Sequence, residues 1–256
     1  MKIISVVNQK GGVGKTMTSI NTSTVLAEYG YKVLAVDFDP QGNLSSGFGF
    51  DENIKQKNNI YNVLLNNLPI EKTILKTKTD NLDILLSNMD LAAFETDVAD
   101  VKNREFILRE AINTIQDKYD FIFFDCPPSL GMLTINALSA STDILIPLQC
   151  EFFALEGLSY LLETAERIKS NLNSKLKILG VLLTMYDKRN KLTEQIENDV
   201  RSSLGDLVFK TVIPRNVKLT ESTSFGIPSV NYDRSCTGSI AYTNFVKEMV
   251  DAYGQK

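Results

Sequence analysis

One short segment near the N-terminus carries the residue types and spacing needed to hold a phosphate chain. The segment Lys10–Thr16 follows an apolar run typical of a strand and precedes a helical pattern. Its three glycines allow backbone N–H groups to converge on an anion, because a Cβ would block that approach, and the positive end of the following helix faces the same point. Lys15 can reach the outer phosphates of a nucleotide, and the Thr16 hydroxyl can bind Mg²⁺. The predicted nucleotide-binding residues of this segment are Lys10, Gly11, Gly12, Val13, Gly14, Lys15, Thr16 and Met17.

Aspartates stand at the ends of two other apolar runs. Asp37 and Asp39 lie where the run 32–37 ends, and Asp125 follows the four apolar residues Phe121–Phe124. Ligands of open parallel sheets bind at the carboxyl ends of the strands, so we expect these carboxylates to face one crevice. Carboxylate oxygens suit Mg²⁺, and we assign Asp125 to the metal together with Thr16. For Asp39, capping of the local turn is the alternative.

Three segments together resemble the deviant Walker A family of ParA and MinD ATPases. Lys10–Thr16 is similar to its phosphate loop, which has an additional lysine at the start. Asp37–Asn43 matches its DxDPQGN motif, and Asp125 with Pro127–Gly131 resembles its Walker B strand and switch region. The resemblance extends over about residues 2 to 245, and it implies that ATP and Mg²⁺ are the cofactors.

The resemblance also implies roles for individual residues. Lys15 would bind phosphates, Lys10 would contact the phosphates of a partner across an ATP-dependent homodimer, and Asp39 would orient the attacking water. These three residues are our catalytic assignments. The family's short chromosome-partitioning members bind double-stranded DNA non-specifically in the dimeric state, and a ParB-like partner stimulates slow ATP hydrolysis and releases them. We therefore expect a partitioning ATPase that segregates a plasmid or chromosome.

Two further assignments concern the nucleotide's base and inner phosphate. By resemblance, Pro214 and Asn216 would lie against the adenine, although an ordinary turn is equally compatible with these residues. Met17 stands where the family usually has a hydroxyl residue that contacts the α-phosphate. Since one hydrogen bond to a charged group is lost, we expect weakened nucleotide binding that is not abolished.

Basic residues gather in the last third of a chain whose net charge is −4. With that net charge, nucleic-acid binding requires a local basic patch. A solvated charged face is the alternative. The resemblance implies that Arg189 and Lys218 contact DNA, and we add their neighbours Lys188 and Arg215 to the predicted DNA-binding set.

The composition excludes several classes of protein. The chain has 256 residues, of which 43% are apolar and 23% charged, as in a globular protein. It contains no histidine, and its three cysteines form no CxxC pair, which argues against histidine-ligated metals, zinc and a disulfide framework. With no apolar run of membrane-spanning length and no signal peptide, we expect a cytoplasmic protein without a membrane partner. The family resemblance implies that it is associated with the nucleoid in its ATP state.

Apolar runs alternate with amphipathic stretches, which predicts an α/β fold: a doubly wound, mainly parallel sheet with helices on both faces. We expect a single domain over residues 1–256, without an N-terminal helix-turn-helix extension, and a surface loop at 51–59. The expected strands are 2–8, 32–37, 82–86, 121–125, 144–148, 178–184 and 208–213. The expected helices are 16–29, 104–118, 133–139, 157–170, 192–204 and 239–253.

Other functions are compatible with a similar phosphate loop. A MinD-like ATPase acting on a membrane would need a basic amphipathic C-terminal helix, whereas the segment Thr243–Tyr253 has one lysine and two acidic residues. A P-loop biosynthetic ligase is the alternative from another class, and its relatives generally lack the Asp37–Asn43 motif. A protein that only binds nucleotide is a third alternative if Met17 disables the site.

Overall fold

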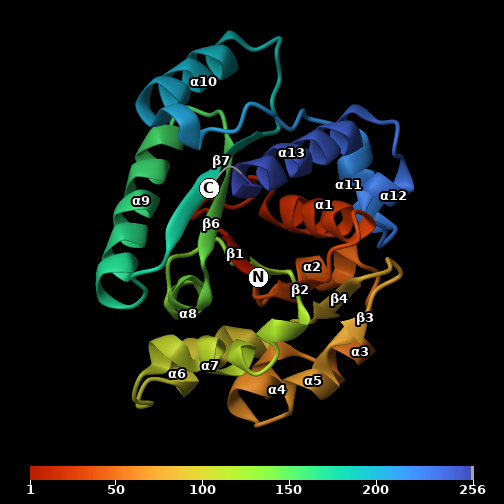
Figure 1. Cartoon of the computed structure of the whole chain (residues 1–256), viewed down its shortest axis with the longest axis vertical. Coiled ribbons are helices and arrows are strands. Elements are labelled where there is room, and N and C mark those ends of the chain that lie inside the picture. Colours follow the sequence, from red (N-terminus) through yellow and green to blue (C-terminus); the bar gives the residue numbers. More distant parts are fainter. Residues whose placement is uncertain (255–256) are drawn as a thin grey trace.

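The centre of the molecule is a seven-stranded sheet with strand order β3-β4-β2-β5-β1-β6-β7 (Figure 1). The computed structural model describes residues 1–254. Strand β3 is antiparallel to β4, and the other neighbouring strands are parallel, which confirms the predicted mainly parallel α/β fold. The strands are β1 (Lys2–Val6), β2 (Val33–Asp37), β3 (Leu75–Lys76), β4 (Leu82–Leu85), β5 (Phe121–Asp125), β6 (Asp143–Gln149) and β7 (Lys177–Thr184).

Helices cover both faces of the sheet because side chains alternate along each strand (Figure 1). Ile4 and Val6 of β1 belong to the core cluster on the α1 and α13 side, while Ile3 and Val7 belong to the cluster on the α8 and α9 side. The longer helices are α1 (Lys15–Glu28), α7 (Ile107–Asn113), α8 (Met132–Ala140), α9 (Ala154–Asn171), α10 (Lys191–Leu204), α11 (Val217–Ser224) and α13 (Thr237–Gly254). The short ones are α2 (Asn43–Gly47), α3 (Glu52–Lys57), α4 (Ile60–Leu65), α5 (Ile70–Thr73), α6 (Phe94–Asp97) and α12 (Ser229–Tyr232).

The register of the central strands brings the predicted site residues to one edge. In β5, Asp125 pairs with Val6 of β1 on one side and with Asp37 of β2 on the other. The phosphate loop follows β1 directly, so loop and carboxylates lie at the carboxyl ends of three adjacent strands. The register thus places the loop and the carboxylates at the edge of the sheet where ligands of such folds bind.

The predicted strand 208–213 is wrong. The segment makes only isolated bridges to the sheet, Val181 with Val208 and Tyr186 with Pro214. The N–H groups of Phe209 and Ile213 donate to Val181 and Leu183 of β7, at 3.0 and 2.8 Å. Between them, Glu248 of α13 accepts hydrogen bonds from the N–H groups of Lys210 (2.6 Å) and Thr211 (2.9 Å), which interrupts the pairing. A sequence pattern cannot reveal these long-range partners, which compete with strand pairing.

The predicted surface loop at 51–59 is also wrong, because it contains helix α3. The Asp51 carboxylate accepts a hydrogen bond from the N–H of Ile54 at 3.0 Å, which caps the helix. The expected helix 104–118 is instead α7 flanked by the 3₁₀ turns η2 (Arg104–Phe106) and η3 (Gln116–Lys118). Within residues 1–254, no helix combines the length and apolarity that a membrane crossing requires.

Candidate nucleotide site and basic groove

The loop between β1 and α1 has the backbone geometry of an anion cradle. Gly12 and Gly14 have φ angles of 77° and 87°, which are unfavourable for other residues, and Gly14 is the N-cap of α1. No acidic residue lies in the first turn of the helix, so its positive end remains available to an anion. Thr184, at the end of β7, donates a hydrogen bond of 2.7 Å to the carbonyl of Val13 and fixes the loop from behind.

Lys15 points its ammonium group into this loop. Its Nζ donates to the carbonyl oxygen of Lys10 at 3.1 Å, and the residue is 7% exposed. Burial lowers the pKa of Lys15, while the nearby carboxylates of Asp125 and Asp39 act in the opposite direction. A weakly hydrated ammonium on an anion cradle is suited to bind phosphate.

Asp125 presents an unused oxygen to the same loop. Its Oδ1 accepts a hydrogen bond from the Ser19 hydroxyl at 2.9 Å, whereas Oδ2 is buried without a hydrogen-bond partner among the described residues. Burial raises the pKa of Asp125 to about 6, and the Thr16 and Ser19 hydroxyls oppose that increase. An unsatisfied buried carboxylate oxygen beside a threonine hydroxyl fits Mg²⁺. Residues 1–254 contain no cluster of three or more protein ligands, so water and phosphates would have to complete the coordination of the ion.

The segment after β2 carries Asp39 on a tightly held turn. Asp37 is fully buried and accepts hydrogen bonds from the N–H and the hydroxyl of Ser45, at 2.8 and 2.6 Å. Burial, with the neighbouring Asp125 charge, raises the pKa of Asp37 to about 7. Asp39 is 8% exposed, and its Oδ1 accepts from the N–H of Gln41 at 2.9 Å. The capping interaction is therefore present, and the charge of Asp39 also acts on Lys15 and Asp125.

Lys10 does not point into the phosphate loop of its own chain. Its side chain is about half exposed, and the ammonium forms an ion pair with Glu151, in the segment that precedes α9. The N–H of Lys10 donates to Asn8 Oδ1 at 2.9 Å. The backbone of Lys10 is thus fixed, while its charged end lies at the surface.

The three residues assigned to the base and inner phosphate line one cavity. Met17, Pro214 and Asn216 surround a space of about 90 Å³ next to Gly14. The Asn216 amide already caps α11, accepting from the N–H of Lys218 at 2.8 Å and donating to the Thr237 hydroxyl at 2.8 Å. The cavity brings these residues together, and the Asn216 side chain is engaged in the turn, so the base-binding assignment stays a prediction.

Met17 lines this cavity with a thioether, whereas the family resemblance leads us to expect a hydroxyl at this position. We expect Met17→Thr to tighten ATP binding by roughly 10- to 100-fold, because a hydrogen bond to a charged group contributes about 1.5–3 kcal/mol. Isothermal titration calorimetry with a slowly hydrolysed ATP analogue measures this change. Met17→Val is the control, since it shortens the side chain without adding a hydroxyl. If both variants bind equally, the missing hydroxyl is not what limits affinity.

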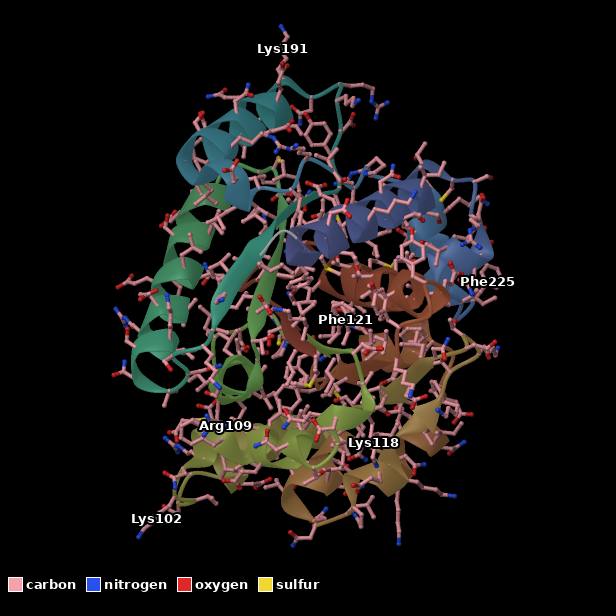
Figure 2. All side chains as sticks on the ribbon, in the orientation of Figure 1. Lys102, Arg109, Lys118, Phe121, Lys191 and Phe225 are labelled. Atoms are coloured by element: carbon pink, nitrogen blue, oxygen red, sulfur yellow. The ribbon has the colours of Figure 1, made fainter. Side chains whose placement is uncertain are left out.

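The predicted DNA-binding residues lie at two places: three of them line one groove, and Lys218 forms an ion pair outside it. Lys188, Arg189 and Arg215 line a groove of about 830 Å³ between the loop after β7 and helix α13. The Arg189 guanidinium donates to both carboxylate oxygens of Asp187, at 2.9 and 2.8 Å, and its side chain is 89% exposed. Figure 2 shows Lys191, at the start of α10, projecting outward at the same end of the molecule.

Lys218 lies outside that groove, on the first turn of α11. Its ammonium pairs with Glu221 at 2.8 Å and lies 5.7 Å from the centre of the Tyr232 ring. Arg189 and Lys218 thus both carry an acidic neighbour, which a DNA phosphate would have to replace. Of the four predicted DNA-binding residues, Lys188, Arg189 and Arg215 therefore line one groove, and Lys218 lies outside it.

Several residues of the site carried no signal in the sequence. Ser19, Glu151 and Thr184 contact residues more than a hundred positions away, and Ser45 contacts Asp37, which is close in the chain. Cys126 is buried, and burial raises the pKa of its thiol, so it suits packing better than nucleophilic attack.

Solved structures similar to this chain contain nucleotides. Cobyrinic acid a,c-diamide synthase from Mycobacterium smegmatis, with bound ATP analog and magnesium, superimposes with a TM-score of 0.87 at 33% identity, covering 99% of this chain and 95% of that one. A putative plasmid partition protein from Borrelia burgdorferi, bound to AMPPNP, gives a TM-score of 0.81 at 27% identity, with coverages of 99% and 98%.

Sequence comparison is more specific about the family. A family model described as an AAA domain matches residues 1–178. The chromosome partitioning protein ParA of Caulobacter vibrioides is 44% identical over 252 residues, covering 98% of this chain and 94% of that protein. The chromosome-partitioning ATPase Soj of Treponema pallidum is 45% identical over 255 residues, covering 100% and 99%. With the phosphate loop, Asp39 and Asp125 positioned as described above, the chain belongs to the ParA/Soj family of partitioning ATPases.

Proposed function

We propose that this protein is an ATP- and Mg²⁺-dependent partitioning ATPase that dimerises on ATP, binds double-stranded DNA non-specifically and is released when a ParB-like partner stimulates hydrolysis. The observation that carries the proposal is the convergence of Lys15, Asp39 and Asp125 on one phosphate loop. The proposed place of action is the cytoplasm, on the nucleoid in the ATP state.

Each group of residues at the site has its own role in hydrolysis. The loop N–H groups and the Lys15 ammonium hold the phosphates, and Thr16 with Asp125 would hold Mg²⁺, which supplies positive charge to the phosphoryl group during transfer. Asp39, fixed by its turn, orients the attacking water. Without a histidine in the chain, the water-orienting group must be a carboxylate or another polar residue, and Asp39 is the acid next to the loop whose position fits.

DNA binding is proposed for the basic groove and Lys218. Arg189 and Lys218 are long, exposed cations that suit phosphate contacts better than base recognition. Each protomer has one such surface, and a dimer would present two to the duplex. This doubling explains why affinity for DNA would depend on ATP in a chain with net charge −4.

Substitution of Lys10 is the most direct test of the proposed ATP-dependent dimer. We expect Lys10→Ala to prevent ATP-dependent dimerisation while leaving measurable ATP binding, because the lysine contacts the phosphates of the partner and not those of its own chain. Light scattering coupled to size-exclusion chromatography with a slowly hydrolysed ATP analogue measures the mass.

The control variant is Glu151→Gln, which removes the same ion pair but keeps Lys10. It should dimerise with ATP as the wild type does. If Lys10→Ala also dimerises normally, Lys10 has no role across the interface. If both variants fail, the Lys10–Glu151 pair supports the fold and the assignment is wrong.

A biosynthetic ligase is the second candidate, because one similar structure is a cobyrinic acid a,c-diamide synthase. A ligase would show ATP hydrolysis that depends on a small-molecule acid and an amine donor. Stimulation of hydrolysis by DNA together with a partner protein, without such substrates, distinguishes the partitioning ATPase.

A further inference from the structure

The ammonium group of Lys55 is buried beside the turn that carries Asp39. Lys55 belongs to α3 and is 2% exposed, although its ion-pair partner Glu52 is 75% exposed. Burying an ammonium without a buried counter-ion is unfavourable, so such a placement needs compensating contacts. Lys55 is therefore unlike Lys57, which is exposed on the same short helix.

The contacts of Lys55 lead to Asp39 in three short steps. Its Nζ donates to the Ser46 hydroxyl at 2.7 Å, in helix α2. The N–H of Ser46 donates to the carbonyl of Gly42 at 3.0 Å, and the N–H of Gly42 donates to the carbonyl of Asp39 at 2.9 Å. Three hydrogen bonds, linked through the covalent structure of Ser46 and Gly42, thus connect the buried ammonium to the backbone of the proposed water-orienting residue.

Gly42 shows how closely Lys55 approaches the turn. The residue has a φ of +63°, and a Cβ added to it would lie 3.2 Å from Lys55 Nζ and 3.1 Å from the carbonyl oxygen of Ser87. No larger side chain fits between the ammonium and the turn. The lysine therefore packs directly on the backbone that follows Asp39.

The neighbouring residue of helix α2, Ser45, is held by Asp37. That carboxylate accepts from both the N–H and the hydroxyl of Ser45, and the Ser45 hydroxyl in turn accepts from the N–H of Ser87 at 3.1 Å. Helix α2 has only five residues, so its own hydrogen bonds cannot fix its orientation. Asp37 and Lys55 together define where this helix and the preceding turn lie.

We propose that Lys55 is a positioning residue for ATP hydrolysis: its buried ammonium holds helix α2 and the turn 39–42 so that Asp39 orients the attacking water. This inference rests on the proposed role of Asp39. Small displacements of a group that positions a nucleophile reduce rates strongly, whereas nucleotide binding depends on the separate loop 10–16. Loss of Lys55 should therefore change the rate and spare the affinity.

The test compares Lys55→Met with Lys57→Met in the full-length chain. Single-turnover hydrolysis of Mg²⁺·ATP is measured next to the dissociation constant for a slowly hydrolysed ATP analogue. We expect Lys55→Met to lower the hydrolysis rate constant about tenfold with a dissociation constant within about twofold of wild type. Lys57→Met should match the wild type in both. An unchanged rate, or a loss of affinity as large as the loss of rate, would overturn the positioning role.

Ser46→Ala provides a second variant that removes only an exposed hydroxyl and is expected to fold. It should slow hydrolysis in the same direction, and Lys55→Met combined with Ser46→Ala should be no slower than Lys55→Met alone, because both interrupt one chain of contacts. Additive effects would contradict that chain.

Asp39→Asn in the same assay distinguishes the water-orienting role of Asp39 from the positioning role of Lys55. If this variant hydrolyses ATP as fast as the wild type, the proposed function of Asp39 fails and the inference fails with it. If Asp39→Asn is slow while Lys55→Met and Ser46→Ala are normal, only the role of Lys55 is refuted.

Discussion

Replacing Asp39 by asparagine is expected to lower the rate of ATP hydrolysis by at least about 100-fold and to leave an ATP-bound dimer that persists. The carboxylate is the group proposed to orient the attacking water. An asparagine retains the oxygen that accepts from the N–H of Gln41, so the turn is preserved while the charge is lost. Single-turnover hydrolysis measures the rate, and light scattering after addition of ATP measures the lifetime of the dimer.

Asp39→Ala is the companion variant, because it removes both the charge and the turn contact. If the two variants are equally slow, the effect comes from the lost carboxylate. If only Asp39→Ala is slow, the aspartate acts as a turn cap and another group orients the water. A variant that remains monomeric in the presence of ATP contradicts the trapped dimer.

Reversing two charges of the proposed DNA surface is the second change with a large expected effect. The double variant Arg189→Glu and Lys218→Glu should lose at least about 100-fold in affinity for DNA, since each protomer loses two phosphate contacts and gains two repulsive ones. ATP binding and dimerisation should remain unchanged, because neither residue lines the phosphate loop. Fluorescence anisotropy with a labelled duplex measures the affinity.

A substitution of Asp187, the acidic neighbour of Arg189, is a control that should raise the affinity for DNA. Asp187 pairs with that guanidinium and also accepts from the N–H of Arg189 at 3.0 Å. Asp187→Asn keeps the backbone contact and removes the competing charge, so DNA should bind a few-fold more tightly. Unaltered affinity in both variants would mean that these cations form only a solvated face.

The central elements of the fold were predictable because their signal is local. The strand β5, for example, is a continuous apolar run that ends in Asp125, and Gly30 ends helix α1 with a φ of +90°. The phosphate loop was equally clear, since Gly12 and Gly14 have the positive φ angles that their type allows. Residue type and order were sufficient for these parts.

Where prediction failed, distant partners decide the structure. The segment 208–213 bonds to β7 only at its two ends, because Glu248 accepts from the two N–H groups between them. Lys55 lay in a polar stretch predicted to be a loop, yet helix α3 and the Asp39 turn bury its ammonium. The Lys10–Glu151 and Ser19–Asp125 contacts also join residues more than a hundred positions apart, and no single segment contains that information.

Control of DNA binding by ATP can be tested with one titration. Binding of the purified protein to two duplexes of unrelated sequence is measured with ATP, with ADP and without nucleotide, at several salt concentrations. We predict binding only with ATP, equal affinity for both duplexes, and a steep decrease with salt that reports about 0.9 units of log–log slope per phosphate contact. Absence of binding in every nucleotide state, or equal binding with and without ATP, would contradict the proposed partitioning cycle.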